Sequence, residues 1–203
     1  MPLAISRLVL ASNNSGKLKE LQQLCRPLHW QVLSQTDFHT PDIEESGLSF
    51  IENAILKARH AAKYSGLPAL ADDSGLEVIA LQGEPGIYSA RYAGEHGNDA
   101  LNNQKLLQSL QHIPDQNRQA NFRCCLALVR HEKDPCPIIA EGIWQGNIAH
   151  ALKGSNGFGY DPLFIVANDN RSSAELTPEE KNSISHRARA FQKLLELIEQ
   201  LNG

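Results

Sequence analysis

The spacing of hydrophobic residues predicts alternating strands and helices at the start of the chain. Residues 5–11 form a short aliphatic run bounded by polar turn formers, which favours a buried strand over a helix. Leucines then recur at helical spacing across residues 17–25, and residues 30–33 form a second extended stretch. This stretch of the chain therefore predicts a strand, a helix and a second strand.

A second helix is predicted over residues 48–64, ending before Gly66. Its apolar positions recur at helical spacing and are expected to face the core: Leu48, Ile51, Ile55, Ala58 and Ala62. A buried strand at residues 69–71 follows and is expected to end in two aspartates.

The centre of the chain predicts one helix and a pair of strands. The helix covers residues 100–110, and strand-like runs occupy residues 121–130 and 138–148. The turn-prone Lys133-Asp134-Pro135 separates these two runs, which indicates an antiparallel pair. A glycine-rich loop at residues 154–159 then leads into another strand.

Two helices are predicted near the end of the chain. The segment Thr177-Pro178-Glu179-Glu180 has a capping residue, a proline at the first helical position and a glutamate three residues after the cap, which marks a helix start. The last helix is expected to bury six apolar residues: Ala188, Phe191, Leu194, Leu195, Ile198 and Leu201.

Strands that alternate with helices early in the chain, followed by paired strands, predict an α/β fold with a mixed sheet. The 203 residues suffice for one sizeable core, or for a core with a smaller lobe, so we expect a single domain over residues 1–203. In such folds, polar residues at the ends of buried strands bind ligands.

Charge and hydropathy limit the possible partners. The formal net charge of -4 leaves no basic face for DNA or RNA, so a nucleic acid polymer is not expected as a partner. No apolar run approaches the length of a bilayer crossing, and the first residues lack the features of a signal peptide. We therefore expect no membrane association and a cytoplasmic location.

The four cysteines favour neither zinc nor a redox pair, because they show no C-x-x-C spacing and no histidine at a metal-finger interval. They are expected to be buried free thiols in a reducing compartment. Cys124 and Cys125, adjacent in a strand, should face opposite sides of the sheet.

A polar loop joins the first strand to the first helix, and its residues are Ser12, Asn13, Asn14, Ser15, Gly16 and Lys17. The first-turn N–H groups of a helix favour an anion, and a lysine adds full charge. The loop is not a Walker motif, because the first glycine is missing and Leu18 replaces the magnesium-binding hydroxyl. The alternative interpretation is a simple turn with a solvated lysine.

Acidic pairs offer a second candidate chemistry. Asp72-Asp73-Ser74 follows a buried run, so one aspartate could brace the structure while the other binds magnesium or accepts a proton from water. Glu44-Glu45 precedes the second helix and could contribute to a metal site, or could merely favour the helix dipole. A turn with a helix cap is the alternative for the aspartates. Lysines and arginines of the second helix are explained equally well by a solvated face.

The segment Phe158-Gly159-Tyr160-Asp161-Pro162 places glycine beside aromatic rings, which allows close approach of a flat ligand and stacking on a base. Ser185-His186-Arg187 opens the last helix with a hydroxyl, an imidazole and a guanidinium. A structural alternative exists, in which Ser185 caps the helix and the other two are merely exposed.

Six motifs in order resemble the inosine/xanthosine triphosphate pyrophosphatases over nearly the whole chain. The motifs are S-N-N-S-G-K, E-E-S-G-L-S-F-I-E-N-A, A-D-D-S-G-L, P-G-I-Y-S-A-R-Y, F-G-Y-D-P-L-F and E-E-K-N-S-I-S-H-R. The resemblance implies an elongated α/β fold of two lobes, with a long mixed sheet flanked by helices and an active site in the cleft between lobes. It also implies hydrolysis of ITP, dITP and XTP to the nucleoside monophosphate and pyrophosphate, with Mg²⁺, by a homodimer that keeps deaminated purines out of DNA and RNA.

The resemblance also assigns roles to residues of this chain. The loop from Ser12 to Lys17 would hold the triphosphate, with Lys17 stabilising the transition state. Asp73 would be the catalytic base and a magnesium ligand, with Glu44 or its neighbour Glu45 as a second ligand. The remaining substrate contacts would come from Ser74, Phe158, Gly159, Tyr160, Asp161, Lys181, His186 and Arg187, of which Phe158 would stack on the base and the last two would donate to it.

Ser12 and Asn13 stand where the family more often has Thr-Gly. Asparagine tolerates a left-handed backbone less easily than glycine, so the loop geometry is an open point. Two other functions are kept as alternatives. One is a related pyrophosphatase for modified pyrimidine or methylated nucleotides, and the other is a nucleotide-binding module without turnover.

Overall fold

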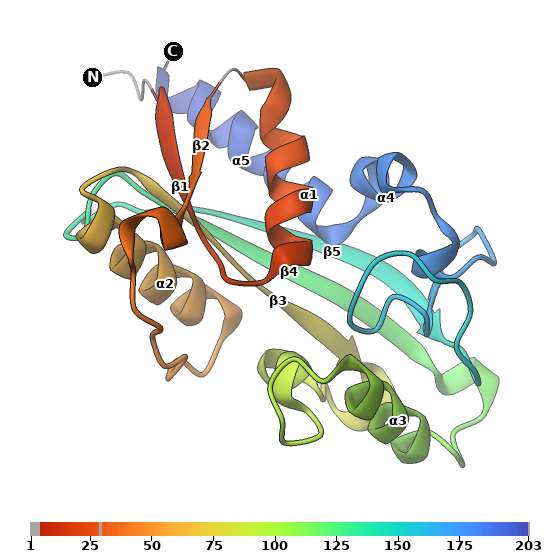
Figure 1. Ribbon diagram of the computed structural model, residues 1–203. Helices are drawn as coiled ribbons and strands as arrows, with labels where there is room; N and C mark the ends of the chain where they lie inside the picture. Colours follow the sequence, from red (N-terminus) through yellow and green to blue (C-terminus); the bar gives the residue numbers. More distant parts are fainter. Residues whose placement is uncertain (1–4, 29, 203) are drawn as a thin grey trace. The chain divides into compact units, whose positions relative to one another are not determined.

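The computed structural model describes residues 5–28 and 30–202 and has an α/β fold (Figure 1). The strands are β1 (Arg7–Ala11), β2 (Gln31–Ser34), β3 (Ala69–Val78), β4 (Gln119–Val129), β5 (Ile138–Ile148) and β6 (Phe164–Val166). The α-helices are α1 (Ser15–Cys25), α2 (Phe50–Ser65), α3 (Asp99–Ser109), α4 (Pro178–Ile184) and α5 (His186–Asn202). Short 3₁₀ helices lie at Arg26–Leu28, Gln35–Phe38, Ile79–Leu81, Gly86–Arg91, Asp115–Asn117 and Ser173–Glu175.

The six strands form one sheet in the order β2-β1-β3-β4-β5-β6. β1 pairs in parallel with both β2 and β3, whereas β5 and β6 are antiparallel. The sheet is therefore mixed, and the predicted α/β class is confirmed. The two central runs are neighbours, as expected, and the Asp134 side chain holds the turn between them by accepting from the backbone N–H of Arg130 (2.9 Å) and of Cys136 (3.0 Å).

The chain divides into two compact units. Unit 1 comprises residues 1–73, 124–142 and 187–203, and unit 2 comprises residues 74–123 and 143–186. The long strands β3, β4 and β5 each contribute residues to both units. One domain over residues 1–203 therefore stays a prediction.

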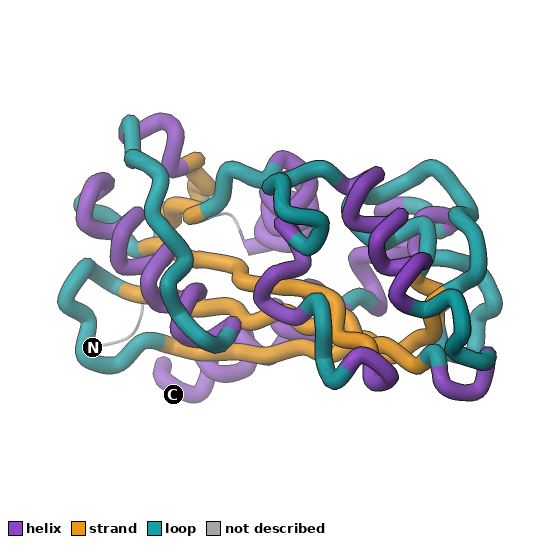
Figure 2. Tube along the Cα trace, turned by 90° about the horizontal axis from the view of Figure 1, so that it is seen from below, coloured by secondary structure: helices purple, strands orange, loops and turns teal. Residues whose placement is uncertain are grey.

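Unit 1 is built in three layers, because alternate residues of its strands face opposite sides. Leu8, Leu70 and Leu126 pack with residues of α1 and α5 on one face. Their neighbours Val9, Ala71 and other small residues pack against α2 on the opposite face. Figure 1 shows α2 on one side of these strands and α1 and α5 on the other, and Figure 2 shows strands passing between helices.

Unit 2 has its own core. Leu76 and Val78 of β3 pack with Leu106 and Leu110, which anchor α3 and its C-terminal end, and with a group of aromatic side chains. These aromatics include Phe122, Trp144, Tyr160 and Phe164.

Most predicted elements are confirmed, including the capping box at Thr177, but some residues that were expected to be buried are exposed. The buried residues of α2 are Asn53, Ala54, Ala58, Ala61 and Ala62. Ala58 and Ala62 are therefore buried as expected, whereas Leu48 is 84% exposed and Ile51 is 37% exposed. Small alanines allow the helix to approach the sheet closely, which the larger residues would prevent. Leu201, expected to be buried, is 62% exposed near the end of α5.

β3 does not end at its two aspartates, as expected, but continues to Val78. The strand can pass through Asp72 and Asp73 because cations pair with both carboxylates. Beyond the two acids, Leu76 and Val78 return to the alternating apolar pattern of a strand.

Three of the four thiols are buried and free, as expected, but Cys136 is exposed. Cys124 and Cys125 belong to the two opposite faces of the unit 1 sheet, which confirms the predicted alternation. Burial raises the pKa of Cys25 and of Cys125 to about 12, so both are thiols at neutral pH. Across the described ranges, no helix combines the length and hydrophobicity that crossing a bilayer requires.

The buried Arg118 side chain joins separate backbone segments of unit 2, and its substitution should lower the stability of the fold. The guanidinium donates to the carbonyls of Leu110 (2.7 Å), Ile148 (2.8 Å) and Ala149 (3.0 Å). Arg118→Ala leaves these acceptors buried without that donor, so we expect the free energy of unfolding to fall by about 3 kcal/mol or more. Chemical denaturation measures this change, with Arg7→Ala, at an exposed position, as the control. A decrease of less than about 1 kcal/mol in the free energy of unfolding of Arg118→Ala would contradict this structural role.

Candidate active site

The predicted phosphate loop is a capped helix start. Asn14 is the N-cap of α1, and its side-chain oxygen accepts from the backbone N–H of Lys17 (3.0 Å). The Ser12 hydroxyl accepts from the N–H of Asn14 (3.1 Å), which tightens the turn before the helix. The loop therefore presents the positive end of α1 beside the Lys17 side chain, as an anion site requires.

Asn13 does not need the backbone conformation that glycine would supply. Among the described residues other than glycine, positive φ occurs only at His39, Gln82, Asn168 and Asn170. The Asn13 side chain instead ties the loop to its surroundings, by donating to Asp42 Oδ1 (2.6 Å) and accepting from Gln35 Nε2 (2.6 Å). The asparagine is thus compatible with the loop, which settles the point left open by the sequence.

Asp72 is the centre of a buried ionic cluster in unit 1. Its Oδ1 pairs with Lys17 Nζ (2.8 Å), and its Oδ2 pairs with Arg187 Nε (2.7 Å) and accepts from Cys124 Sγ (3.1 Å). Arg187 is also paired with Glu20, one turn along α1 from Lys17. Burial alone would raise the pKa of Asp72, but Arg187 and Lys17 outweigh it and hold the pKa well below its usual value.

Asp73 belongs to a second cluster, as the predicted alternation along the strand requires. Lys57 Nζ donates to Asp73 Oδ1 (2.6 Å), to Glu45 Oε1 (2.8 Å) and to the Asp72 carbonyl (2.9 Å). Burial raises the pKa of Asp73, and the charge of Glu45 adds to this, although Lys57 and Lys17 oppose it. Burial would lower the pKa of Lys57, but Asp73 and Glu45 outweigh it and raise that pKa. Asp73 is therefore a carboxylate with more proton affinity than Asp72, which suits a base.

The same cluster offers oxygen ligands for a metal ion. Glu45 and Asp73 converge on one cationic group, the Lys57 ammonium, so two hard oxygen donors already meet around positive charge. Glu44, the ligand first expected, is exposed. Residues 5–28 and 30–202 hold no group of three or more His, Cys, Asp or Glu side chains suited to a metal.

The predicted base-binding segment lies in unit 2, where Asp161 organises it. We call residues 157–161 the base loop. Asp161 Oδ2 accepts from the backbone N–H of Phe158 (2.8 Å) and from Lys181 Nζ (2.5 Å), and its Oδ1 accepts from Ser173 Oγ (2.8 Å). A Cβ at Gly157, whose φ is 76°, would collide with the Asp161 carboxylate. Position 157 therefore requires glycine, because the buried Asp161 carboxylate lies against its Cα atom.

The Lys181 ammonium lies 4.9 Å from the centroid of the half-buried Phe158 ring. Tyr160 is buried, and its hydroxyl donates to the Ser89 carbonyl (2.8 Å), so its side chain holds the loop to unit 2. Phe158 of the base loop and Lys181 of α4 are thus the groups suited to contact a flat ligand.

His186 and Arg187 open α5 as predicted, but they have different surroundings. The His186 ring stacks on Phe122 at 4.8 Å between centroids in unit 2, whereas Arg187 lies in the Asp72 cluster of unit 1. Both are buried, at 5% and 1% exposure. Ser74, the remaining predicted contact, is half-buried and directly follows Asp73 on β3.

Sequence reasoning missed three residues of these clusters: Lys57, Glu20 and Cys124. From the sequence alone, a solvated helix face explains Lys57, although this lysine directly precedes the buried Ala58. Only knowledge of which face of α2 meets β3 would have found it. Glu20 lies three residues after Lys17, a spacing that places both on one side of α1.

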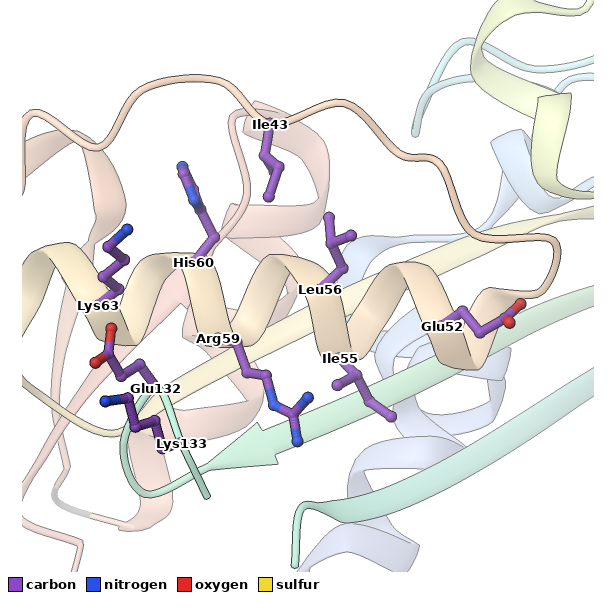
Figure 3. Close-up of a pocket in the computed structure, with 9 residues that line it drawn as sticks. All are labelled: Ile43, Glu52, Ile55, Leu56, Arg59, His60, Lys63, Glu132 and Lys133. Carbon is purple, nitrogen blue, oxygen red and sulfur yellow. The ribbon is translucent and has the colours of Figure 1, made fainter. Parts of the chain in front are cut away.

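A surface cavity of about 550 Å³ lies beside α2, and none of the residues that line it was predicted as a site residue (Figure 3). Its lining residues are Ile43, Glu52, Ile55, Leu56, Arg59, His60, Lys63, Glu132 and Lys133. Two of its polar side chains hold backbone, since Arg59 donates to the Asp134 carbonyl and His60 Nε2 contacts the Pro41 carbonyl. Its contacts therefore serve the local fold, and it shares no group with the two ionic clusters.

Comparison with known proteins gives a consistent result. The family model described as Ham1 family matches residues 8–197. A protein of Pseudomonas syringae pv. tomato named dITP/XTP pyrophosphatase is 60% identical over 187 residues, covering 92% of this chain and 94% of its own. A protein of Coxiella burnetii with the same name is 54% identical over 187 residues, with the same coverage.

Solved structures agree with these sequence matches. A structure titled as a HAM1 protein from Coxiella burnetii matches with a TM-score of 0.88 and 52% identity, covering 97% of this chain and 100% of that one.

Proposed function

The chain belongs to the Ham1 family, and we propose that it hydrolyses deaminated purine nucleoside triphosphates (ITP, dITP and XTP) to the nucleoside monophosphate and pyrophosphate. The observation that carries this proposal is the Asp73–Lys57–Glu45 cluster next to the Asp72–Lys17 pair, which combines a base, cations and oxygen ligands. Hydrolysis would keep such nucleotides from polymerases that make DNA and RNA.

We assign the triphosphate to the loop from Ser12 to Lys17. Attack between the α- and β-phosphates develops negative charge on the phosphoryl oxygens and on the leaving pyrophosphate. The Lys17 ammonium and the first-turn amides of α1 are suited to stabilise that charge. Asp72, with its depressed pKa, keeps a permanent negative charge that orients Lys17.

Asp73 is proposed as the base. Its carboxylate holds a proton more readily than Asp72 does, and Lys57 orients it through a 2.6 Å contact. Asp73 would accept the proton of the attacking water as the new phosphorus–oxygen bond forms. Ser74, next in the chain, would contact the substrate.

We propose Mg²⁺ as the cofactor, held by Asp73 and Glu45. A magnesium ion typically keeps several waters and binds one or two carboxylates together with substrate phosphates, which fits a protein contribution of two carboxylates. When bound, it would neutralise phosphate charge and polarise the phosphoryl oxygens.

The choice between the two adjacent glutamates can be tested with a matched pair of variants. We expect Glu45→Gln to raise the magnesium concentration for half-maximal activity by about tenfold, because the second carboxylate ligand is lost. Glu44→Gln, at the neighbouring exposed position, should leave it unchanged. Magnesium titrations of both variants decide this, and the reverse result would restore Glu44 as the ligand.

We place the purine base with the base loop and its neighbours. Phe158 is proposed as the stacking surface, and Lys181 and Asp161 as the groups that hold it. His186 and the backbone of Gly159 and Tyr160 complete the proposed base contacts. Arg187 was expected to read the base directly, and its two carboxylate partners indicate a second role that is tested below.

Pyrophosphate release from ITP, measured with and without Mg²⁺, tests the function. Release that requires Mg²⁺ and leaves IMP is the expected result. Binding of ITP without release would instead support a nucleotide-binding module, and preference for a modified pyrimidine or methylated nucleotide would support the related pyrophosphatases.

We propose a cytoplasmic location and a homodimer. Three buried free thiols suit a reducing compartment. The homodimer rests on the family resemblance, and light scattering coupled to size-exclusion chromatography tests it.

A further inference from the structure

Helix α3 holds both backbone groups of one residue in the base loop. The N–H of Gly159 donates to Asp99 Oδ2 (2.7 Å), and its carbonyl accepts from Asn103 Nδ2 (2.8 Å). Asp99 and Asn103 are four residues apart, so they lie on the same side of α3. The two contacts therefore restrain the peptide groups on both sides of the Gly159 Cα atom.

The orientation of the Asn103 amide follows from its neighbours. Nδ2 also donates to the Asp99 carbonyl (2.9 Å), and both groups at this end are carbonyl oxygens, so the amide nitrogen must lie there. In the part of the chain that the structure describes, the buried amide oxygen has no hydrogen-bond partner. A buried acceptor without a partner is unfavourable. The side chain nevertheless keeps the orientation in which its nitrogen donates to the Gly159 carbonyl.

Gly159 has a backbone conformation that glycine adopts easily. Its φ is 61°, and a Cβ added there would meet nothing within 4 Å. Glycine is therefore required by the backbone angle and not by a lack of space. Because this angle sets the direction of the chain between Phe158 and Tyr160, the two contacts from α3 restrain the backbone next to Phe158.

The two contacts join Gly159 to a helix that is itself fixed in the core of unit 2. Leu106 and Leu110, at the other end of the helix, are fully buried, so α3 is fixed to that core. The residues just before the loop, 151–156, are exposed. Asp99 and Asn103 thus restrain the base loop close to the point where an exposed stretch of chain leads into it.

We propose that Asp99 and Asn103 are positioning residues that set base selectivity by fixing the Gly159 backbone and, through it, Phe158. This inference rests on the proposed function, because it assumes that the base loop binds the purine. A displacement of about 1 Å at a substrate-positioning group can change rates by about a hundredfold. Loss of the two contacts with Gly159 should therefore lower kcat/KM for a nucleotide with the preferred base more than for one with a rejected base.

Asn103→Leu tests the proposal, with Asn102→Leu as a matched control. Asn102 is also a buried asparagine of α3 with two backbone partners, but it binds Ala93 N–H (2.8 Å) and the Ala90 carbonyl (3.3 Å). Both variants should lower the melting temperature. We expect only Asn103→Leu to reduce the ratio of kcat/KM for ITP to that for ATP, by about tenfold or more.

A second pair of variants does not depend on a buried site. Asp99 is exposed, so both of its variants should fold. Asp99→Ala removes the acceptor for the Gly159 N–H and should reduce the ITP/ATP ratio. Asp99→Asn keeps an acceptor oxygen and should restore the ratio, although both variants lose the same favourable charge in the first turn of α3.

The outcomes separate this proposal from the function on which it rests. A wild-type protein that releases no pyrophosphate from ITP contradicts the proposed function, and the inference falls with it. If the wild type prefers ITP and the ratio survives in both Asn103→Leu and Asp99→Ala, only the inference is overturned. Equal changes in the Asn103→Leu and Asn102→Leu ratios would also overturn it, since they would indicate a general loss of structure.

Discussion

Asp73→Asn is expected to lower kcat by about a hundredfold or more while the protein stays folded, because the substitution removes the charge and basicity of the carboxylate but keeps its shape. Asp73 is the partner of Lys57 and Glu45 in the cluster that we assign to proton transfer and metal binding. An amide cannot accept that proton, and it is a weaker ligand for a metal ion than a charged carboxylate. Steady-state pyrophosphate release from ITP at saturating Mg²⁺ measures the effect.

The control for Asp73→Asn is an exposed aspartate elsewhere in unit 1. Asp42→Asn keeps a side-chain oxygen at Oδ1 that can accept from Asn13, and it should leave kcat within about twofold of the wild type. Thermal unfolding of both variants shows whether lost activity reflects lost structure. Activity near the wild-type level in Asp73→Asn would remove this residue from the mechanism.

Local patterns predicted most elements of the fold. The strand at residues 138–148 and the capped helix after Thr177 both depend on short-range signals, which are alternation in one case and a capping box in the other. The face of α2 was predicted only in part: Ala58 and Ala62 are buried as expected, whereas Ala54 and Ala61 were missed, because alanines carry little hydrophobic signal although they pack closely. The sequence pattern ranks residues by hydrophobicity, whereas close packing against a sheet selects small ones.

The candidate site was predicted in part for a related reason. Lys17 and Asp73 follow recognisable local features, a strand-to-helix loop and an acidic pair. The partners of these residues come from distant segments, as when Arg187 meets Asp72 across 115 positions of the sequence. Charge pairing over such separations leaves no periodic signal, so the role of Lys57 and the engagement of Arg187 became visible only in the structure.

The largest expected effect is the discrimination between ITP and ATP. Hypoxanthine and xanthine carry a keto oxygen at the position where adenine carries an amino group, so a site lined with donors leaves those donors unpaired when ATP binds. A buried hydrogen-bonding site that faces the wrong partner can discriminate by ~10⁴ or more, and we expect a ratio of this order in kcat/KM. GTP shares the keto group, so its rejection must arise at the 2-amino position. Competition assays with ITP, ATP and GTP measure both ratios.

Arg187→Ala identifies which residues provide this discrimination. The Arg187 guanidinium is buried between Asp72 and Glu20, and removing it leaves both carboxylates without that cation. We therefore expect the free energy of unfolding to fall by about 3–5 kcal/mol. Activity toward ITP should also fall, because Asp72 no longer holds Lys17 in a fixed position.

If Arg187 acts through Asp72, its loss should slow ITP and ATP hydrolysis in parallel and leave their ratio intact. The donors that read the base would then be backbone groups of the base loop, together with His186. If Arg187 donates to the base itself, as the resemblance implies, the ITP/ATP ratio should narrow sharply. The parallel loss is the expected result, because both carboxylate partners of Arg187 belong to unit 1, one of them holding Lys17 and the other sharing its helix. Glu20→Gln removes the negative charge of the second partner of Arg187 and changes no residue assigned to the substrate. It should therefore cause a milder loss that is again parallel for ITP and ATP.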